Sequence, residues 1–181
     1  AGFGADLGAE KFLDIKCQSA GLTPKAVVVT TTIRALKYHG GADLKSLTTE
    51  NVNALKRGIP NLEKHLENIQ QFNLVPIISI NRFVSDTEEE IETIIQFAKE
   101  NNIRVSLAEV WKKGGKGSVD LAKQVVEIVE SGESNFKPLY DWISPVEDKI
   151  ETITSKIYGA SQVEYSSKAK KNLKTISDLG L

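Results

Sequence analysis

The sequence is poor in cysteine and histidine and has no methionine: its 181 residues include one Cys and two His. The single cysteine, Cys17, excludes a disulfide within the chain and favours a reducing compartment, which predicts a cytoplasmic protein. We interpret Cys17 as a structural thiol, because no His or Asp motif accompanies it. The first residues read AGFGADLGAEKF, like the interior of a motif, so we expect a piece of a longer protein.

Long apolar runs and a strong charge of either sign are also missing. No run approaches the ~20 apolar residues of a membrane span, and no signal peptide is visible. The formal net charge is -1, so neither a nucleic-acid partner nor a membrane surface is expected. With 40% hydrophobic and 26% charged residues, the chain is suited to one α/β region with a sizeable core.

No metal site is predicted. Neither His39 nor His65 belongs to a cluster with the spacing of metal ligands. The acidic run Glu88 to Glu90 follows Ser85-Asp86-Thr87, which is a good start for a helix. We interpret this run as a solvated first turn, favoured by the helix dipole, and not as a metal site.

The stretch from Val75 to Gly117 organises the sequence. Two short apolar runs, Val75–Ile80 and Ile103–Val110, flank the charged, 3.6-periodic segment Thr87–Asn101. Strand, helix, strand with a crossover of this length favours two parallel strands joined right-handedly. Both strands then end at the same edge of the sheet, where ligands of open parallel sheets bind.

Candidate binding residues follow both strands. Asn81, Arg82 and Phe83 come directly after the first strand, and Glu109 and Trp111 lie at the end of the second. The second strand also leads into a glycine-rich loop that contains Gly114 and Gly115. Two aromatic residues at one edge can face each other across a slot, and we predict that this slot binds a flat heterocycle.

A third loop is expected at the same edge. The run Ala26–Ile33 is the strongest β pattern and predicts a central parallel strand that is buried on both faces. It leads into Arg34 and Lys37, which could neutralise a phosphate or carboxylate or could be ordinary surface cations. His39 follows in a glycine turn, where an acid–base role competes with a merely polar one.

The glycines at the start allow two interpretations. Gly2, Gly4 and Asp6 precede a helical pattern, and glycines at that place can leave backbone N–H groups free for an anion. The segment matches neither the GxxxxGK[ST] pattern nor GxGxxG after a strand, so a tight turn with Asp6 as a cap is the competing interpretation.

Together these patterns predict an α/β fold, with a mostly parallel sheet flanked by helices in P-loop or Rossmann-like layers, truncated at both ends. We expect a parallel αβ core over residues 1–135 and a helical extension over residues 136–181. The extension should contain helices at Val146–Ile157 and Ser167–Leu179. A short strand is predicted between them, at residues 162–165.

Five motifs resemble one known family when they are taken together. They are AGFGADLGAEKF, TIRALKYHGG, INRF followed by DT, EVWKKGG, and IYGASQVEYSSKAKKNLK. In this order they closely resemble the middle-to-late part of formate–tetrahydrofolate ligase (10-formyltetrahydrofolate synthetase), over essentially the whole chain. The resemblance implies that Phe83 and Trp111 clamp the flat ring of the ligand. It implies only a general role near the active site for Gly2, Gly4, Asp6 and the loop from Arg34 to Gly41.

In that family, ATP and formate give formyl phosphate, and the formyl group passes to N10 of tetrahydrofolate. The resemblance thus implies ATP with Mg²⁺ as cofactor, formate and tetrahydrofolate as substrates, and a homo-oligomeric full-length enzyme. The sequence contains no GxxxxGKT-type loop, which the family needs for the triphosphate. Because phosphoryl transfer needs a preorganised phosphate cradle, we predict that this piece is inactive alone.

Several positions depart from the family pattern. Val84 replaces the usual Pro after Phe83, which puts the rigidity of that loop in doubt. The other departures alter local charge or polarity and are Thr30, Thr31, Lys112, Lys116 and Ser118. Two alternatives stay open: a non-enzymatic α/β module that binds a flat heterocycle, and a dinucleotide-dependent oxidoreductase. The oxidoreductase is the weaker, because RALKYHGG stands where GxGxxG is required.

Overall fold

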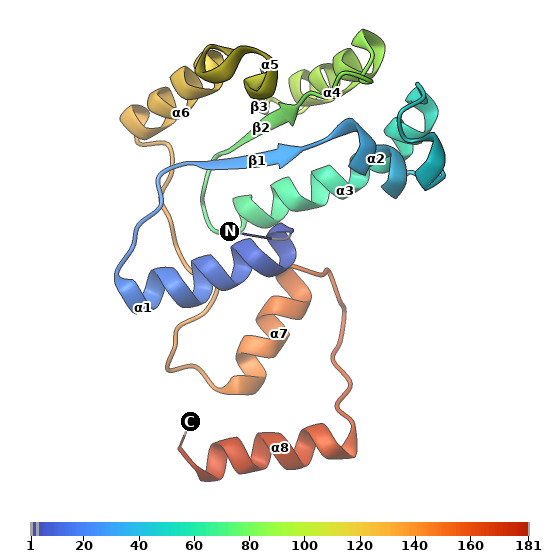
Figure 1. The fold of residues 1–181 in the computed structure, drawn as a ribbon. Coiled ribbons are helices and arrows are strands. Elements are labelled where there is room, and N and C mark those ends of the chain that lie inside the picture. Colours follow the sequence, from blue (N-terminus) through green and yellow to red (C-terminus); the bar gives the residue numbers. More distant parts are fainter. Residues whose placement is uncertain (1, 3, 181) are drawn as a thin grey trace.

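The computed structural model describes residue 2 and residues 4–180. Three parallel strands form its sheet in the order β1 (Val27–Thr31), β2 (Pro76–Asn81) and β3 (Arg104–Ala108), as Figure 1 shows. In register, Val28 lies beside Ile77, and Ile78 beside Val105. The predicted α/β fold with a parallel sheet flanked by helices is confirmed.

Helices occupy most of the remaining chain. The first helical segment is wound as π-helical turns over Ala5–Ala9 and Phe12–Cys17 and ends in α1 (Gln18–Ala20). Two 3-10 turns cover Leu44–Ser46 and Gly114–Ser118. The other helices are α2 (Ile33–His39), α3 (Val52–Gln70), α4 (Glu88–Glu100), α5 (Val110–Lys113), α6 (Val119–Ser131), α7 (Val146–Lys156) and α8 (Ser167–Asp178).

One face of the sheet is covered by α3 and α4. Successive right-handed crossovers between neighbouring strands place both connecting helices on the same face. Ile78 and Ile80 of β2 point toward this face and are fully buried in a core that includes Leu62 of α3 and Ile94 of α4. Thr87 begins α4 with a capping box, in which its side chain and that of Glu90 satisfy each other's backbone N–H groups.

The opposite face is covered by α6. Ile77 of β2 points to this side and is 0% exposed, and Ile128 of α6 is equally buried. The helix contacts β3 and β2, but it leaves β1 uncovered. Val28 of β1 is accordingly 39% exposed. The sheet is therefore covered on both faces at β2 and on only one face at β1.

The position of β1 corrects one prediction. Residues 27–31 were expected to form a central strand buried on both faces, but β1 lies at the edge of the sheet and pairs only with β2. Its burial alternates between half-buried and exposed until Thr31, which is buried. A continuous apolar run indicates only that a strand can be buried on both faces. Within the described residues, no second strand lies beside β1.

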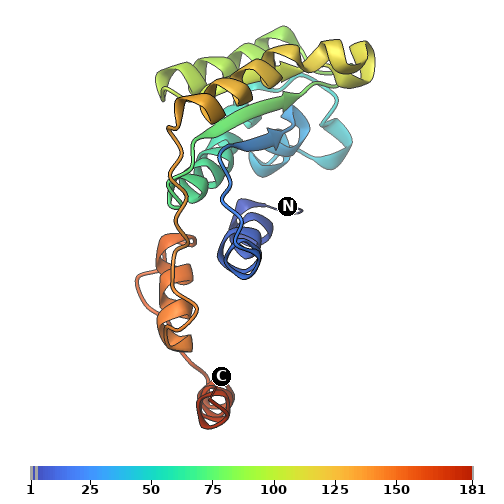
Figure 2. The same ribbon diagram turned by 90° about the vertical axis from the view of Figure 1, so that its left-hand side faces the viewer.

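The C-terminal region packs on the first helical segment and not on the sheet. Ile157, just after α7, is buried against Leu13, Cys17 and Phe72 in a second core. Figure 2 shows α7 and α8 extending away from the sheet, and α8 has no buried residue. The short strand predicted at residues 162–165 is wrong, because this segment pairs with no strand in the part of the chain that the structure describes.

Candidate functional site

The ends of β2 and β3 bring the two predicted aromatic residues to one cavity. Because the strands are parallel, the chain leaves both at the same edge, and the N–H of Arg82 still donates to the carbonyl oxygen of Ala108 at 3.1 Å. The cavity measures about 240 Å³ and is lined by Arg82, Phe83, Val84, Glu109, Trp111 and Lys112. We call this cavity the aromatic slot.

Phe83 is held in place from two directions. Its N–H donates to Oδ2 of Asp86 at 2.7 Å, which closes the turn after β2. The guanidinium carbon of Arg34 lies 4.4 Å from the centre of the Phe83 ring, at a cation–π distance. Arg34 also donates to Oγ of Ser85 at 3.1 Å. The sequence left Arg34 either as a partner for an anion or as an ordinary surface cation; in the structure its guanidinium is directed at Phe83 and covers part of that ring.

Trp111 is much less constrained. It lies in the short helix α5 and is 65% exposed, whereas Phe83 is half-buried. A large apolar side chain that is this exposed beside a cavity is available for contact with a ligand. The slot therefore combines one aromatic ring that is held by neighbouring residues and one that is largely exposed to solvent.

Glu109 supplies a negative charge at the slot. A hydrogen bond from Lys113 lowers the pKa of Glu109, and the charges of Lys113, Arg82 and Lys112 act in the same direction against a smaller desolvation. The Arg82 guanidinium lies 3.7 Å from Oε1 of Glu109, and Arg82 also pairs with Glu88. Glu109 is thus ionised at neutral pH and can accept hydrogen bonds from ligand N–H groups.

The glycine-rich loop folds back against Glu109. The N–H of Glu109 donates to the carbonyl oxygen of Gly117 at 3.0 Å. A Cβ at Gly117 would lie 2.5 Å from the carbonyl oxygen of Glu109, so only glycine fits this approach. Gly114 has a φ of 57° and ψ of −148°, a conformation open to glycine alone. The loop shapes the wall of the slot without lining it.

Lys37 does not lie at the ligand edge, which corrects its assignment. Its Nζ is 2.8 Å from Oε1 of Glu90, and the two side chains are 1% and 0% exposed. The ammonium also donates to the carbonyl oxygen of Thr49 at 2.9 Å. Because Lys37 lies on the same face of α2 as the buried Ile33 and Leu36, its side chain enters the interior, where it cannot contact a bound anion.

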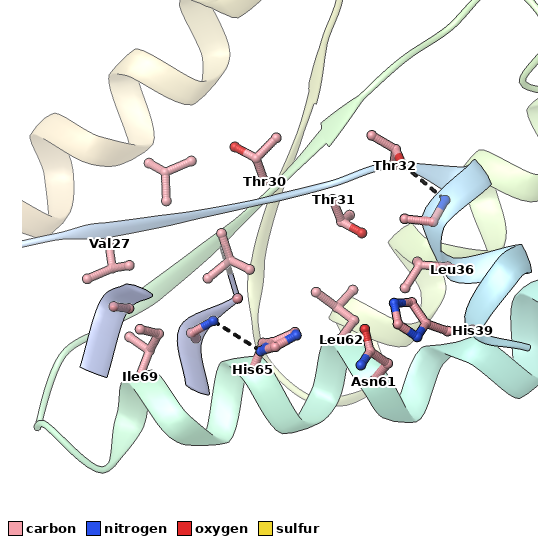
Figure 3. Close-up of a pocket in the computed structure, with 16 residues that line it drawn as sticks. Val27, Thr30, Thr31, Thr32, Leu36, His39, Asn61, Leu62, His65 and Ile69 are labelled. Atoms are coloured by element: carbon pink, nitrogen blue, oxygen red, sulfur yellow. Dashed lines mark hydrogen bonds between the residues drawn. The ribbon is translucent and has the colours of Figure 1, made fainter. Parts of the chain in front are cut away.

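A second cavity runs along β1, and Figure 3 shows it between this strand and α3. It measures about 450 Å³. Gly4 and His39, which were predicted as site residues, line this cavity together with Asn61 and His65. We call it the β1 groove. His39 thus lies at the β1 groove and not at the aromatic slot, whereas Arg34, at the start of the same predicted loop, contacts Phe83 of the slot.

His65 was missed as a lining residue, since the sequence places it among charged neighbours and suggests a solvated side chain. The N–H of Ala5 donates to its Nδ1 at 3.3 Å, so the neutral ring carries its proton on Nε2. Asp6 lies nearby, with Oδ1 at 3.9 Å from the same nitrogen. The contact joins residues 60 positions apart. The only sequence signal that His65 lines the cavity was its helical spacing to Leu62 and Ile69, which places it on the same side of the helix.

The remaining predicted residues lie outside both cavities. Asn81 ends β2 and pairs in register with Ala108. Gly115 lines a shallow depression beside α6, and Asp6 lines a cavity that adjoins the β1 groove near Tyr158. The carbonyl of Gly2 packs closely against Gly8. These positions shape the surroundings of the cavities.

Three further features concern the described part of the chain. Residues 2 and 4–180 contain no group of three or more His, Cys, Asp or Glu side chains that could hold a metal ion. No helix in these residues has the length and apolar character required to cross a membrane. Cys17 is free and buried, as expected of a structural thiol.

Comparison with known proteins identifies the family. The family model of formate–tetrahydrofolate ligase matches residues 1–181. Formate–tetrahydrofolate ligase of Staphylococcus aureus strain Newman is 56% identical over 180 residues, which is 99% of this chain and 32% of the relative. The ligase of strain NCTC 8325 is 55% identical over the same share of each chain. The chain thus spans about a third of the length of these relatives, and it belongs to the formate–tetrahydrofolate ligase family.

Proposed function

We propose that residues 1–181 supply the aromatic slot of an ATP-dependent ligase that joins formate to tetrahydrofolate through formyl phosphate. In this proposal, Phe83 and Trp111 clamp the flat ring of the folate or of adenine. The observation that carries the proposal is that both aromatic side chains line one cavity at the carboxyl ends of two parallel strands. Family membership supplies the identity of the ligands.

The size and chemistry of the slot fit one ring system. Its volume of about 240 Å³ is below the ~300–1,000 Å³ of pockets that enclose a whole drug-sized ligand. A ring would stack on Phe83 and Trp111, while the ionised Glu109 accepts hydrogen bonds from its amino and ring N–H groups. The rest of the folate or nucleotide would extend beyond the slot.

The residues of this chain bind and orient, and they do not activate phosphate. The sequence has no GxxxxGK[ST] loop. Mg²⁺ is usually held by one or two carboxylates together with substrate phosphates, so its site is expected where the triphosphate binds. We therefore assign ATP, Mg²⁺, formate, homo-oligomer formation and a cytoplasmic location to the whole enzyme, as inferences from its family. The isolated chain should be inactive in formyl transfer.

Tryptophan fluorescence tests the slot directly. Folic acid, and separately ATP, is titrated into the isolated chain and into its Trp111→Ala variant. The matched control is Trp142→Phe, because Trp142 is the only other tryptophan and donates to the carbonyl oxygen of Asp14, far from the slot in sequence. We expect saturable quenching that Trp111→Ala abolishes and Trp142→Phe retains.

Phe83→Ala measures the second ring. Loss of one aromatic stacking contact, worth about 0.5–1.5 kcal/mol, should weaken binding of the same probe about 2- to 12-fold. Quenching that survives Trp111→Ala and disappears in Trp142→Phe would refute the assignment. Quenching by ATP alone would identify the slot as an adenine site.

A further inference from the structure

The turn after β2 is closed by the side chain of Asp86. Its Oδ2 accepts from the N–H of Phe83 at 2.7 Å, and its own N–H donates to the carbonyl oxygen of Phe83 at 3.1 Å. A side-chain oxygen that accepts from a nearby backbone N–H fixes the local conformation of the chain. Asp86 is 5% exposed and does not line the aromatic slot. It therefore acts on Phe83 from behind and sets the direction in which this side chain leaves the turn.

Arg34 covers one face of the Phe83 ring. Its guanidinium carbon lies 4.4 Å from the ring centre, and its Nη2 is held by Oγ of Ser85 at 3.1 Å. Phe83 lines the aromatic slot, whereas Arg34 does not. Because the guanidinium occupies one face of the ring, a flat ligand can stack only on the other face, which is turned toward the slot.

Each of the two charged side chains keeps one polar atom unsatisfied. Nε of Arg34 and Oδ1 of Asp86 are buried and have no hydrogen-bond partner among the described residues. Burial raises the pKa of the Asp86 carboxyl, whereas the hydrogen bond from Phe83 and the charge of Arg34 lower it. Buried polar groups without a partner lower stability and call for an explanation in function. The constraint that both residues place on Phe83 supplies one.

We propose that Arg34 and Asp86 are positioning residues of the ligase, which act on the bound heterocycle only through the ring of Phe83. Asp86 fixes the backbone of Phe83, and Arg34 holds the plane of the ring, so that one face stays open to the ligand. This role rests on the proposed function of the aromatic slot. It extends that function to two residues that lie outside the cavity.

A residue that acts only through Phe83 loses its effect once the ring is gone. In the Phe83→Ala background, removal of Arg34 or Asp86 should therefore change binding no further, whereas residues with independent roles would add their effects. The effect of either residue is also limited by what the Phe83 stack contributes, which is about 2- to 12-fold in affinity.

Steady-state kinetics of the full-length ligase test this coupling, with KM measured for tetrahydrofolate and for ATP. Phe83→Ala shows which of the two substrates stacks on the ring. We expect Arg34→Met and Asp86→Ala to raise the KM of the same substrate about 2- to 12-fold and to leave kcat within about twofold, because stacking is present both before and during the reaction. In the Phe83→Ala background, either change should alter this KM by less than about 1.5-fold.

Conservative variants and a distant arginine are the controls. Asp86→Asn keeps an oxygen that accepts from the N–H of Phe83 and should recover most of the affinity lost in Asp86→Ala. Arg34→Lys keeps a cation near the ring and should be intermediate between Arg34→Met and the native enzyme. Arg104→Met should leave both KM values unchanged, because Arg104 begins β3, at the opposite end of the strands from the slot. Should Asp86→Ala fail to fold, Arg34→Met carries the same test.

The outcomes separate the positioning role from the function of the slot. Native KM values in Phe83→Ala would overturn both. A raised KM in Phe83→Ala together with native values in Arg34→Met and Asp86→Ala would overturn the positioning role alone. Additive effects in the double variants would also overturn it, because Arg34 and Asp86 would then act independently of the ring.

Discussion

The buried pair of Lys37 and Glu90 offers a sharp test of how the loops at the ligand edge are held. Beyond the 2.8 Å contact between Lys37 Nζ and Glu90 Oε1, the same oxygen accepts from the N–H of Asn51 at 2.9 Å. The other oxygen of Glu90 accepts from the N–H of Thr87 at 3.3 Å. Asn51 and Thr87 are the N-caps of α3 and α4. One carboxylate thus joins α2 to the starts of two other helices.

The variant Lys37→Met removes the cation and leaves the carboxylate of Glu90 buried with only backbone donors. Breaking a buried pair from one side costs about 3–5 kcal/mol, because the remaining charge is uncompensated. At about 2–4 °C per kcal/mol for a chain of this length, the melting temperature should fall by roughly 6–20 °C. Thermal unfolding followed by circular dichroism at pH 7 measures the change.

The pH dependence separates a charge effect from a packing effect. Burial raises the pKa of Glu90, but the hydrogen bonds from Lys37, Asn51 and Thr87 outweigh it, so the pKa lies below its ordinary value of 4.5. In the native chain this stability is present above the unfolded-state pKa and is lost as the pH falls through the folded-state pKa. Without Lys37, burial dominates and the pKa should rise. The stability difference between Lys37→Met and the native chain should therefore shrink from pH 7 to pH 5.

The double variant Lys37→Met, Glu90→Gln completes the test. The amide oxygen of Gln can still accept from Asn51, and no charge is left in the interior, so the double variant should be more stable than Lys37→Met alone. A constant stability difference between pH 5 and pH 8, together with no recovery in the double variant, would refute the electrostatic explanation. The loss would then arise from packing of the lysine side chain.

Two further predictions concern stability. Burial raises the pKa of Asp14 to about 7, so the stability contributed by this group is full below the unfolded-state pKa and is lost as the pH rises through 7. Asp14→Asn should make the free energy of unfolding, measured with urea, less dependent on pH between pH 4 and pH 8. The same pH dependence in the variant and in the native chain would contradict this prediction. Gly58→Ala should lower the free energy of unfolding by about 1–3 kcal/mol, because the added Cβ would lie 1.9 Å from the carbonyl oxygen of Leu36. The control Gly115→Ala should be nearly neutral, because no atom lies within 4 Å of the added Cβ.

The sequence predicted the part of the fold that depends on local patterns. The two apolar runs around residues 87–101, with a crossover helix between them, led directly to β2, α4 and β3. The Thr87 capping box lies where Ser85-Asp86-Thr87 and the acidic turn indicated. The co-location of Phe83 and Trp111 followed from the parallel direction of the strands, because that direction fixes which loops meet.

Contacts between distant segments could not be predicted in this way. Lys37 was assigned to the ligand edge by its residue type, and only the position of Glu90, 53 residues later, directs it inward. Nδ1 of His65 accepts a hydrogen bond from the N–H of Ala5, and no rule of sequence spacing connects these two residues. The edge position of β1 could not be predicted either, because an apolar run has the same composition whether or not a second strand lies beside it.

Arg34 and Lys37 show how the β1 groove and the aromatic slot are connected. Both lie on α2, one turn apart, yet Arg34 supports the ring of Phe83 while Lys37 fixes the starts of α3 and α4. α2 begins at Thr32, which caps it through the N–H of Ala35 at 3.1 Å and directly follows β1. α2 therefore connects the end of β1 to the ring of Phe83 on one side and to the starts of α3 and α4 on the other.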